Sequence, residues 1–441
     1  MERYDSYKDS GVKWLGEIPS HWDSASLLYL LRAKISDGPH ETPNLIEDGI
    51  PFISIDSLND TKEIYFSVVK KFISYKDYER YCYKTKLEKG DVLFSKAATI
   101  GKTAIVGDGV FMVWSPLAIL KPNLDKISSL YLYYIMNCKK AIDEVSLSGS
   151  KNTQINVGMR ELEKIRIPIP SIEEQSKITY FLEKETSKID EAIAQQQKMI
   201  DLLNERKQII INNAVTKGLD PNVKMKPSGI DWIGDIPEHW EARKLGSIGS
   251  TINGVSHDSA YFGEGYPFVS YSDVYKNVSL PKTVLGLAKS SNQERLLFSV
   301  EKGDVFFTRT SETAEEIAFS STCLETIENA VFAGFLIRFR PKQGLIEPSF
   351  SKYYFRAYIH RSYFVKEMNL VIRASLSQQL LKGLPILLPS LKEQREIADY
   401  LDNQIIGIDS CISNINKQIS LLQERKQIII NDVVTGKVKV V

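Results

Sequence analysis

Residues 205–212 read ERKQIIIN, and residues 424–431 read ERKQIIIN again. Each copy lies near the end of a stretch of about 45 residues that begins after a proline, is almost free of glycine and proline, and ends before a glycine. Ser171 follows the first of these prolines and Glu174 stands three residues later, which is a capping-box pattern. The repeated stretch therefore predicts two long helices, each roughly 65 Å in length.

The apolar residues of both helices recur every three or four positions, which is the spacing of a coiled-coil seam. Because the connector between the two helices is short and holds a motif of its own, the second helix must run back along the first. We therefore expect an antiparallel pair that brings the two chain ends together. The seam residues are Ile178, Leu182, Ile189, Ile193, Ile200, Leu203, Ile210 and Ala214, and then Ile397, Leu401, Ile408, Ile412, Ile415, Ile419, Leu422, Ile429 and Val433.

The repeat extends beyond the helices. SGVKWLGEIPSHW at 10–22 corresponds to SGIDWIGDIPEHW at 228–240, and LEKGDVLFSK at 87–96 corresponds to VEKGDVFFTR at 300–309. In the second pair a Lys-Gly-Asp turn leads into a short apolar strand that ends in a cation. The segments between these landmarks have little in common. One scaffold thus occurs twice with different inserts, which suggests two different targets.

Two further pairs of segments complete the pattern. YLYYIMNC at 131–138 and KYYFRAYI at 352–359 predict half-buried helices, while IRIPIP at 165–170 and LPILLP at 384–389 predict short edge strands limited by proline. We expect an α+β fold: two globular domains separated by two long helices in an antiparallel coiled coil, as a pseudo-two-fold tandem repeat. The expected boundaries are 1–168 and 217–387 for the globular domains, and 169–216 and 388–441 for the helices.

Composition narrows the class of protein further. The 441 residues carry a net charge of +1, so no overall basic bias indicates nucleic acid and none excludes it. The four cysteines have neither metal nor disulfide spacing, the start of the chain is polar, and no apolar run has the length of a membrane span. These features predict a cytoplasmic protein that does not enter a membrane.

No motif for catalysis or metal binding stands out. TIGKT at 99–103 lacks the first glycine of a phosphate-binding loop, because Lys96 occupies that position. His21 and His239 each precede a tryptophan, with no second ligand at metal spacing, so packing explains them better than zinc does. The sequence predicts no catalytic residue, no metal site and no cofactor.

Nucleic-acid binding has more support. The first variable region interleaves lysines with tyrosines, and both variable regions have loops rich in amides, hydroxyls and cations that suit phosphate and base contacts. The alternative for any one of these residues is a solvated loop. The candidate DNA contacts are Lys96, Lys102, Lys151, Asn152 and Gln154 in the first region, and Arg309, Ser311, Arg373, Ser375 and Gln378 in the second.

The duplicated tryptophan motif, the GDVLFSK strand and the IPIPSIEEQ lead into a long ERKQIII helix resemble the specificity subunit of type I restriction–modification systems. The resemblance spans nearly the whole chain. It implies two target-recognition domains that each read one half of a split sequence in double-stranded DNA, on a subunit without catalytic activity. One departure is Asn253-Gly254-Val-Ser-His257, where the first half has Asp37-Gly38-Pro-His40, which leaves the register of His257 open.

The resemblance also implies partners. Two methyltransferase (modification) subunits would dock on the helices, and restriction/translocase subunits would join that core. S-adenosylmethionine and ATP would bind to those partners and not to this chain. The partner-binding candidates are Glu205, Arg206, Gln208, Glu424, Arg425 and Gln427.

Two other classes of function remain open from the residues alone. One is a stand-alone DNA-modifying enzyme with unrecognised motifs, for which the purified chain would act on DNA by itself. The other is a coiled-coil adaptor that binds only protein, for which no duplex would bind even with a methyltransferase present.

Overall fold

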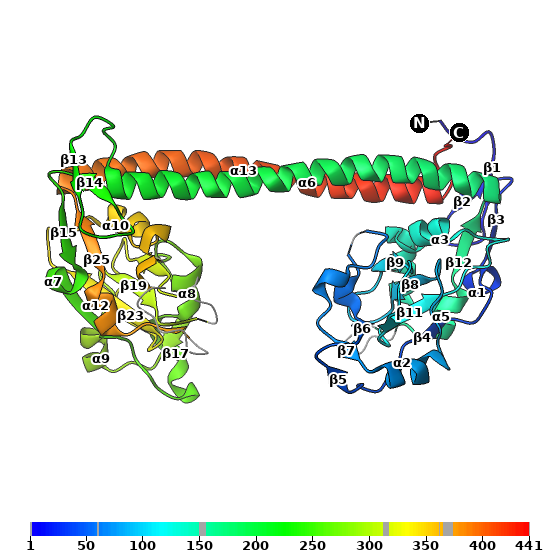
Figure 1. The fold of residues 1–441 in the computed structure, drawn as a ribbon, viewed down its shortest axis with the longest axis horizontal. Helices are drawn as coiled ribbons and strands as arrows, with labels where there is room; N and C mark the ends of the chain where they lie inside the picture. Colours follow the sequence, from blue (N-terminus) through cyan, green and yellow to red (C-terminus); the bar gives the residue numbers. More distant parts are fainter. Residues whose placement is uncertain are drawn as a thin grey trace. The chain divides into compact units, whose positions relative to one another are not determined.

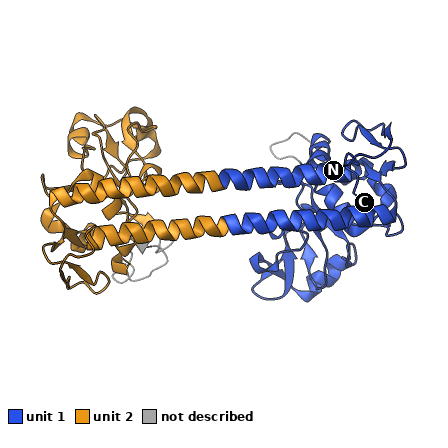
Figure 2. Ribbon diagram, turned by 90° about the horizontal axis from the view of Figure 1, so that it is seen from above, with its two compact units in different colours: residues 1–196, 416–441 blue, residues 197–415 orange. Residues whose placement is uncertain are grey.

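A computed structural model describes residues 2–59, 61–149, 156–311, 317–360, 362–364 and 374–440 of the chain (Figure 1). The chain divides into two compact units. Unit 1 comprises residues 1–196 and 416–441, and unit 2 comprises residues 197–415 (Figure 2). Each unit therefore contains one globular part, one segment of the first long helix and one segment of the second.

The globular part of unit 1 is built from short strands and helices. Its four-stranded sheet β4-β11-β8-β9 contains the GDVLFS strand. A second sheet, β10-β6-β7-β5, is formed by strands that lie in sequence between β4 and β11. The elements are β1 Tyr7–Asp9, β2 Glu17–Pro19, β3 Asp23–Ser26, α1 Leu27–Leu30, β4 Ser36–Asp37, β5 Leu45–Ile46, β6 Ile50–Ile53, η1 Ile55–Ser57, η2 Phe66–Val68, β7 Phe72–Ile73, α2 Tyr75–Cys82, β8 Val92–Ser95, β9 Thr103–Ile105, β10 Met112–Val113, β11 Leu117–Leu120, α3 Ser129–Met136, α4 Lys139–Leu147, α5 Met159–Lys164, β12 Arg166–Ile169 and α6 Ile172–Lys217.

Unit 2 repeats this topology. Its sheet β16-β23-β19-β21 corresponds to β4-β11-β8-β9, and the parallel pair of β17 and β22 corresponds to that of β6 and β10. The elements are β13 Met225–Pro227, β14 Asp235–Pro237, β15 Glu241–Lys244, α7 Leu245–Ile248, β16 Gly249–Asn253, η3 Ser259–Tyr261, β17 Phe262–Val269, α8 Tyr271–Lys276, β18 Gly286–Ala288, α9 Asn292–Leu297, β19 Val305–Thr308, β20 Thr310–Ser311, β21 Ser320–Thr322, β22 Val331–Phe332, β23 Leu336–Pro341, α10 Pro348–Tyr354, η5 Tyr358–His360, β24 Ala374–Ser375, α12 Gln378–Gly383, β25 Pro385–Leu388 and α13 Leu391–Val434.

The predicted landmarks are confirmed. The two GDV segments form β8 and β19, the tyrosine-rich segments form α3 and α10, and the proline-limited segments form β12 and β25, which pair with β3 and β15 in two-stranded sheets. The long helices α6 and α13 have 46 and 44 residues. The fold is the expected α+β tandem.

The two long helices pair antiparallel within each unit. In unit 1 the Lys426 ammonium lies 2.7 Å from the Asp190 carboxylate, and Gln196 donates to Gln418 further along. In unit 2 Lys207 makes the equivalent ion pair with Asp409, also at 2.7 Å. Each predicted seam residue is buried or half-buried, because the apolar stripe of one helix covers that of the other.

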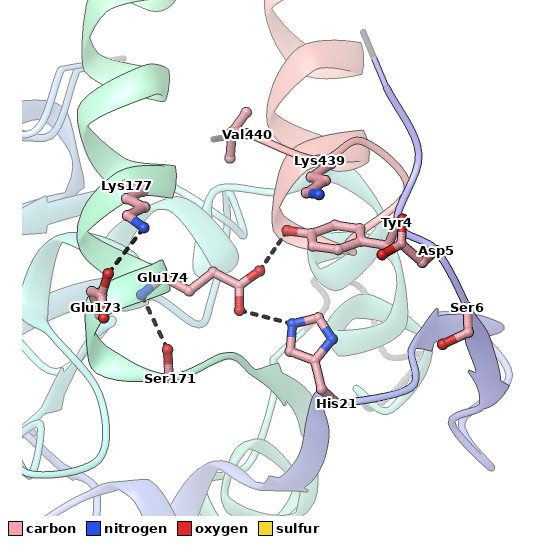
Figure 3. A pocket seen from close by; sticks show the side chains of 10 residues that line it. All are labelled: Tyr4, Asp5, Ser6, His21, Ser171, Glu173, Glu174, Lys177, Lys439 and Val440. Carbon is pink, nitrogen blue, oxygen red and sulfur yellow. Dashed lines mark hydrogen bonds and ion pairs between the residues drawn. The ribbon is translucent and has the colours of Figure 1, made fainter.

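The chain ends meet in unit 1, as expected from an antiparallel pair. The amide of Lys439 donates to the carbonyl of Glu2 at 2.9 Å, and this contact forms an antiparallel bridge. In the adjoining cavity of about 400 Å³, the Tyr4 hydroxyl donates to the Glu174 carboxylate at 2.6 Å (Figure 3). Burial, and then Glu174, raises the pKa of Tyr4 well above its ordinary value.

The same glutamate fastens the tryptophan motif to the first long helix. Glu174 lies 3.1 Å from His21 Nε2, beside the fully buried Trp22. The Glu174 backbone amide donates to the Ser171 hydroxyl at 3.2 Å, whereas the Glu174 carboxylate binds His21 and Tyr4. Only the serine half of the expected capping box therefore forms. In unit 2 the Trp240 indole donates to Glu393 at 2.9 Å.

Leucine-to-alanine changes on one helix test the seam. Leu182 is fully buried and Leu202 is 50 % exposed, although both lie on α6. We expect Leu182→Ala to lower the free energy of unfolding by about 2–5 kcal/mol, because it leaves a cavity. Leu202→Ala should cost no more than about 0.5 kcal/mol. Urea unfolding of the two variants measures both values, and equal losses would contradict the assigned seam.

Candidate nucleic-acid interface

A buried carboxylate shapes the turn before each candidate cation. Gly90 and Gly303 adopt φ angles of 89° and 95°, which glycine tolerates best. The following Asp91 and Asp304 are almost completely buried. Asp91 lies 2.8 Å from Arg32, and Asp304 lies 2.6 Å from Arg340, so each carboxylate has a cationic partner. This arrangement fixes where β8 and β19 start.

Lys96 and Arg309 occupy equivalent positions where these strands end. The Lys96 amide donates to the Pro116 carbonyl, and its own carbonyl accepts from Val157, both at 2.9 Å. The Arg309 amide donates to the Phe335 carbonyl at 2.9 Å, and its carbonyl accepts from Leu376 at 2.7 Å. Matching backbone bonds thus place one candidate cation in each unit.

The surroundings of the two cations differ. Lys96 is 7 % exposed, and its ammonium lies 3.2 Å from Oδ2 of Asp37. The imidazole of His40 lies 3.1 Å from the same oxygen. A contact between Lys96 and a phosphate would therefore have to compete with a buried carboxylate. Lys102 is half-buried, and its amide is bound by the Ser95 hydroxyl at 2.8 Å.

A neutral network replaces this ion pair in unit 2. Asn253 occupies the strand position of Asp37, since both residues pair with the central strand at equivalent places. Its Oδ1 accepts from the Gln378 amide at 3.1 Å, and Gln378 in turn accepts from the Thr251 hydroxyl at 2.9 Å. The half-buried Arg309 has no side-chain hydrogen bond or ion pair with any residue that the structure describes. Arg309 is thus available to an external anion or base.

The other candidates fall into two groups. Ser375 in β24 is exposed, and β24 pairs with β20, which places the backbone of Ser311 beside it. Together with Gln378 at the start of α12, these residues lie in sequence next to Arg309 or to its backbone partner Leu376. The predictions that fall outside the described residues are Lys151, Asn152, Gln154 and Arg373.

Sequence reasoning missed the roles of Asp37 and Asn253. The two segments that contain them were recognised as a corresponding but diverged pair, which was the available signal. The structure sets their register: a Cβ at Gly38 would lie 1.8 Å from the Val113 carbonyl oxygen, and one at Gly254 would lie 2.1 Å from that of Phe332. Both glycines are therefore required for close backbone approach.

His257 is bound within unit 2. Its imidazole stacks on Tyr261 at 4.0 Å and lies 2.7 Å from the Glu294 carboxylate. Hydrogen bonds from Ser291, first from its backbone amide, lower the pKa of Glu294 to about 2, and His257 adds to this shift. His257 thus supports the start of α9. The register that the sequence left open is set by the strand pairing, in which Asn253 takes the place of Asp37.

The candidate partner-binding residues lie on the long helices. Glu205, Arg206 and Gln208 are exposed, as are Glu424 and Arg425, while Gln427 is half-buried. Exposed apolar side chains flank both copies of this motif. Leu202 and Ile209 are 50 % and 51 % exposed in unit 2, and Leu421 and Ile428 are 63 % and 50 % exposed in unit 1. Seven-residue spacing puts each pair on one face of its helix.

Within the described ranges, no three histidine, cysteine, aspartate or glutamate side chains are grouped so that they could hold a metal ion. No helix among the described segments is both long and apolar enough to cross a lipid bilayer.

The chain thus has the organisation of a two-domain recognition protein. One α+β scaffold occurs twice, and the cation at the end of β8 or β19 has different neighbours in each copy. Residues 41–200 and 237–421 match the family described as "Type I restriction modification DNA specificity domain". The chain therefore belongs to the family of type I restriction–modification DNA specificity subunits.

Known relatives share nearly the full length of the chain. The putative type I restriction enzyme MjaX specificity subunit of Methanocaldococcus jannaschii is 29 % identical, with 98 % of each chain covered. The MjaVIII specificity subunit of the same organism is 24 % identical, covering 90 % of this chain and 87 % of that protein. A chain from a solved type I R-M system has a TM-score of 0.67 at 17 % identity, with 95 % and 98 % covered, and supports the fold.

Replacing the neutral Asn253 by aspartate tests whether the residue at this strand position sets the difference between the two cations. Asn253→Asp would place a carboxylate where unit 1 has Asp37. We expect weaker DNA binding and a plot of log K against log salt that is flatter by about 0.9, since one cation no longer neutralises a phosphate. Titrations of labelled duplex at several salt concentrations measure this slope.

Asn403→Asp is the matched control, because it adds the same charge at an exposed position of α13 in the same unit. An equal change of slope in both variants would mean that net charge, and not the neighbourhood of Arg309, sets the effect.

Proposed function

We propose that this chain reads a bipartite sequence in double-stranded DNA, with residues 1–168 reading one half-site and residues 217–387 the other. The observation that carries the proposal is the match of each half to a DNA specificity domain, over two copies of one scaffold. Equivalent positions carry Asp37 and Lys96 in one copy but Asn253 and Arg309 in the other. Two different half-sites would explain this divergence.

The chemistry of the candidate residues suits this task. A guanidinium binds guanine in the major groove with two hydrogen bonds, and asparagine or glutamine side chains pair in the same way with adenine. In unit 2 Arg309 offers a guanidinium, Gln378 an amide that already bonds Asn253 and Thr251, and Ser375 an exposed hydroxyl. Lys102 offers a cation in unit 1. The proposed DNA surface also includes Lys96, whose ammonium is paired with Asp37. It is completed by the candidates Lys151, Asn152, Gln154, Ser311 and Arg373.

The proposed partners of the helices are two methyltransferase subunits, one on each unit. Each unit presents an exposed apolar pair beside a copy of the ERKQ motif, Leu202 and Ile209 in one and Leu421 and Ile428 in the other. Exposed leucine and isoleucine next to arginine are typical of a protein interface. Restriction/translocase subunits would bind the assembled core. Catalysis, S-adenosylmethionine and ATP would belong to these partners, so the chain itself would be non-catalytic and free of cofactors.

A region swap tests the division of labour. Residues 30–160 would be replaced by the matching region of a relative with a different target, and methylated adenines would be mapped across the genome of a host expressing the methyltransferase. We expect one half of the methylated sequence to change and the other to persist, because each scaffold copy holds its own inserts.

Three other results would contradict the proposal. A swap that changes both half-sites would indicate one composite site. Methylation by the purified chain alone would indicate a DNA-modifying enzyme. Failure to bind any duplex, even in the methyltransferase complex, would indicate a protein-binding adaptor.

A double substitution tests the proposed docking surface in unit 2. Leu202→Ser with Ile209→Ser removes two exposed apolar contacts and should leave the fold intact. We expect the complex to retain one methyltransferase subunit per chain in place of two, as measured by native mass spectrometry. Leu285→Ser is the control, because Leu285 is 96 % exposed but lies in the globular part of the same unit. Full stoichiometry in the double variant would contradict the assignment.

A further inference from the structure

Phe335 is an exposed aromatic side chain in a chain that buries most of its phenylalanines. Among the described phenylalanines only Phe66 and Phe335 are exposed, at 41 % and 64 %. Phe66 packs edge-on against Phe111 at 5.3 Å. Phe335 is therefore the described phenylalanine with the most apolar surface left to cover.

The turn that carries Phe335 is fixed on several sides. It connects β22 to β23, and the amide of Leu336 closes it by donating to the Ala333 carbonyl at 3.0 Å. The Gly334 amide donates to the Val255 carbonyl at 2.7 Å, and a Cβ at Gly334 would approach that oxygen to 2.9 Å. The backbone at Phe335 is thus held on several sides, so little further ordering of the turn is needed when a ligand covers the ring.

The backbone of Phe335 lies beside that of Arg309. The carbonyl of Phe335 accepts the Arg309 amide at 2.9 Å, which makes the two residues backbone neighbours across the end of the sheet. A guanidinium without a side-chain partner among the described residues, with an exposed aromatic residue as its backbone neighbour, fits a ligand that offers an anion or acceptor next to an apolar group. The major groove of DNA offers this combination, because guanine and phosphate oxygens lie near the thymine methyl group.

Unit 1 builds the same turn without the ring. Leu117 donates to the Trp114 carbonyl at 2.9 Å, and Lys96 donates to the Pro116 carbonyl, so Pro116 occupies the position of Phe335. Pro116 is half-buried, and the neighbouring Lys96 is paired with Asp37. The two units therefore differ at this turn in both the ring and the state of the cation.

We propose that the Phe335 ring contacts the 5-methyl group of a thymine in the half-site read by unit 2, and so determines specificity at that base pair. This inference rests on the proposed DNA-reading function and adds a residue to it. Arg309 holds the neighbouring phosphate or guanine, and the fixed backbone of the turn places Phe335 next to Arg309. Unit 1, with Pro116, makes no such methyl contact.

The test uses the full chain assembled with its methyltransferase subunits. Methylated adenines are first mapped for the native protein, for Phe335→Ala and for Pro116→Ala. We expect Phe335→Ala to relax one thymine position of a single half-site and Pro116→Ala to leave both half-sites unchanged. Each thymine of that half-site is then replaced by uracil, which lacks the methyl group, in synthetic duplexes.

At the relaxed position, uracil should weaken binding of the native complex roughly fourfold, the effect of one buried methyl group. The Phe335→Ala complex should bind thymine and uracil duplexes equally. The proposal is overturned if Phe335→Ala keeps the native sequence preference. It is also overturned if the substitution weakens binding of the thymine and uracil duplexes by the same factor, so that the fourfold difference persists, as loss of a wedge between bases would do. Thermal melting confirms that the variant is folded. If the native complex recognises no bipartite sequence, the proposed function itself fails, which is a separate outcome.

Discussion

The apolar seam between α6 and α13 is the interaction on which the rest of the structure depends. Neither helix can bury its stripe alone, because a single helix of this length leaves one face in water. Once the helices pair, Ile178 and Leu182 join the core of the globular part in unit 1, and Ile397 and Leu401 join that of unit 2. Each unit thus takes its core from segments that are distant in sequence, and neither globular part is independent of the helices.

A second constraint joins the repeated motifs to this frame. The histidine near the end of each tryptophan motif contacts a glutamate in the first turn of a long helix, Glu174 in unit 1 and Glu393 in unit 2. In unit 2 the Trp240 indole donates to the same glutamate. This connection fixes the entry of the chain into the globular part. It also gives these residues a structural reason to recur in the sequence, since a misplaced tryptophan would disturb the adjoining helix.

The sequence was sufficient for the frame because the frame relies on local rules. Proline, glycine and the spacing of isoleucine and leucine determine the helices, and the Lys-Gly-Asp turn determines β8 and β19. The pairing of Lys96 with Asp37 was not predictable in the same way. It depends on two strands that meet only in the tertiary fold, so the difference between Asp37 and Asn253 could be read in the sequence but not its consequence for the cation. For the same reason, the sequence identified Arg309 as a cation but did not show that it lacks a side-chain partner among the described residues.

The contact between Glu2 and Lys439 has a practical consequence for labelling. Both chain ends leave the protein at the same place, and the segments just inside them depend on each other and on Tyr4. Energy transfer between fluorophores attached to the two ends through short linkers would therefore report on whether the contact between Glu2 and Lys439 is formed. A bulky affinity tag at either end would crowd the contact between Glu2 and Lys439, so an internal loop of unit 2 is the better attachment site for purification.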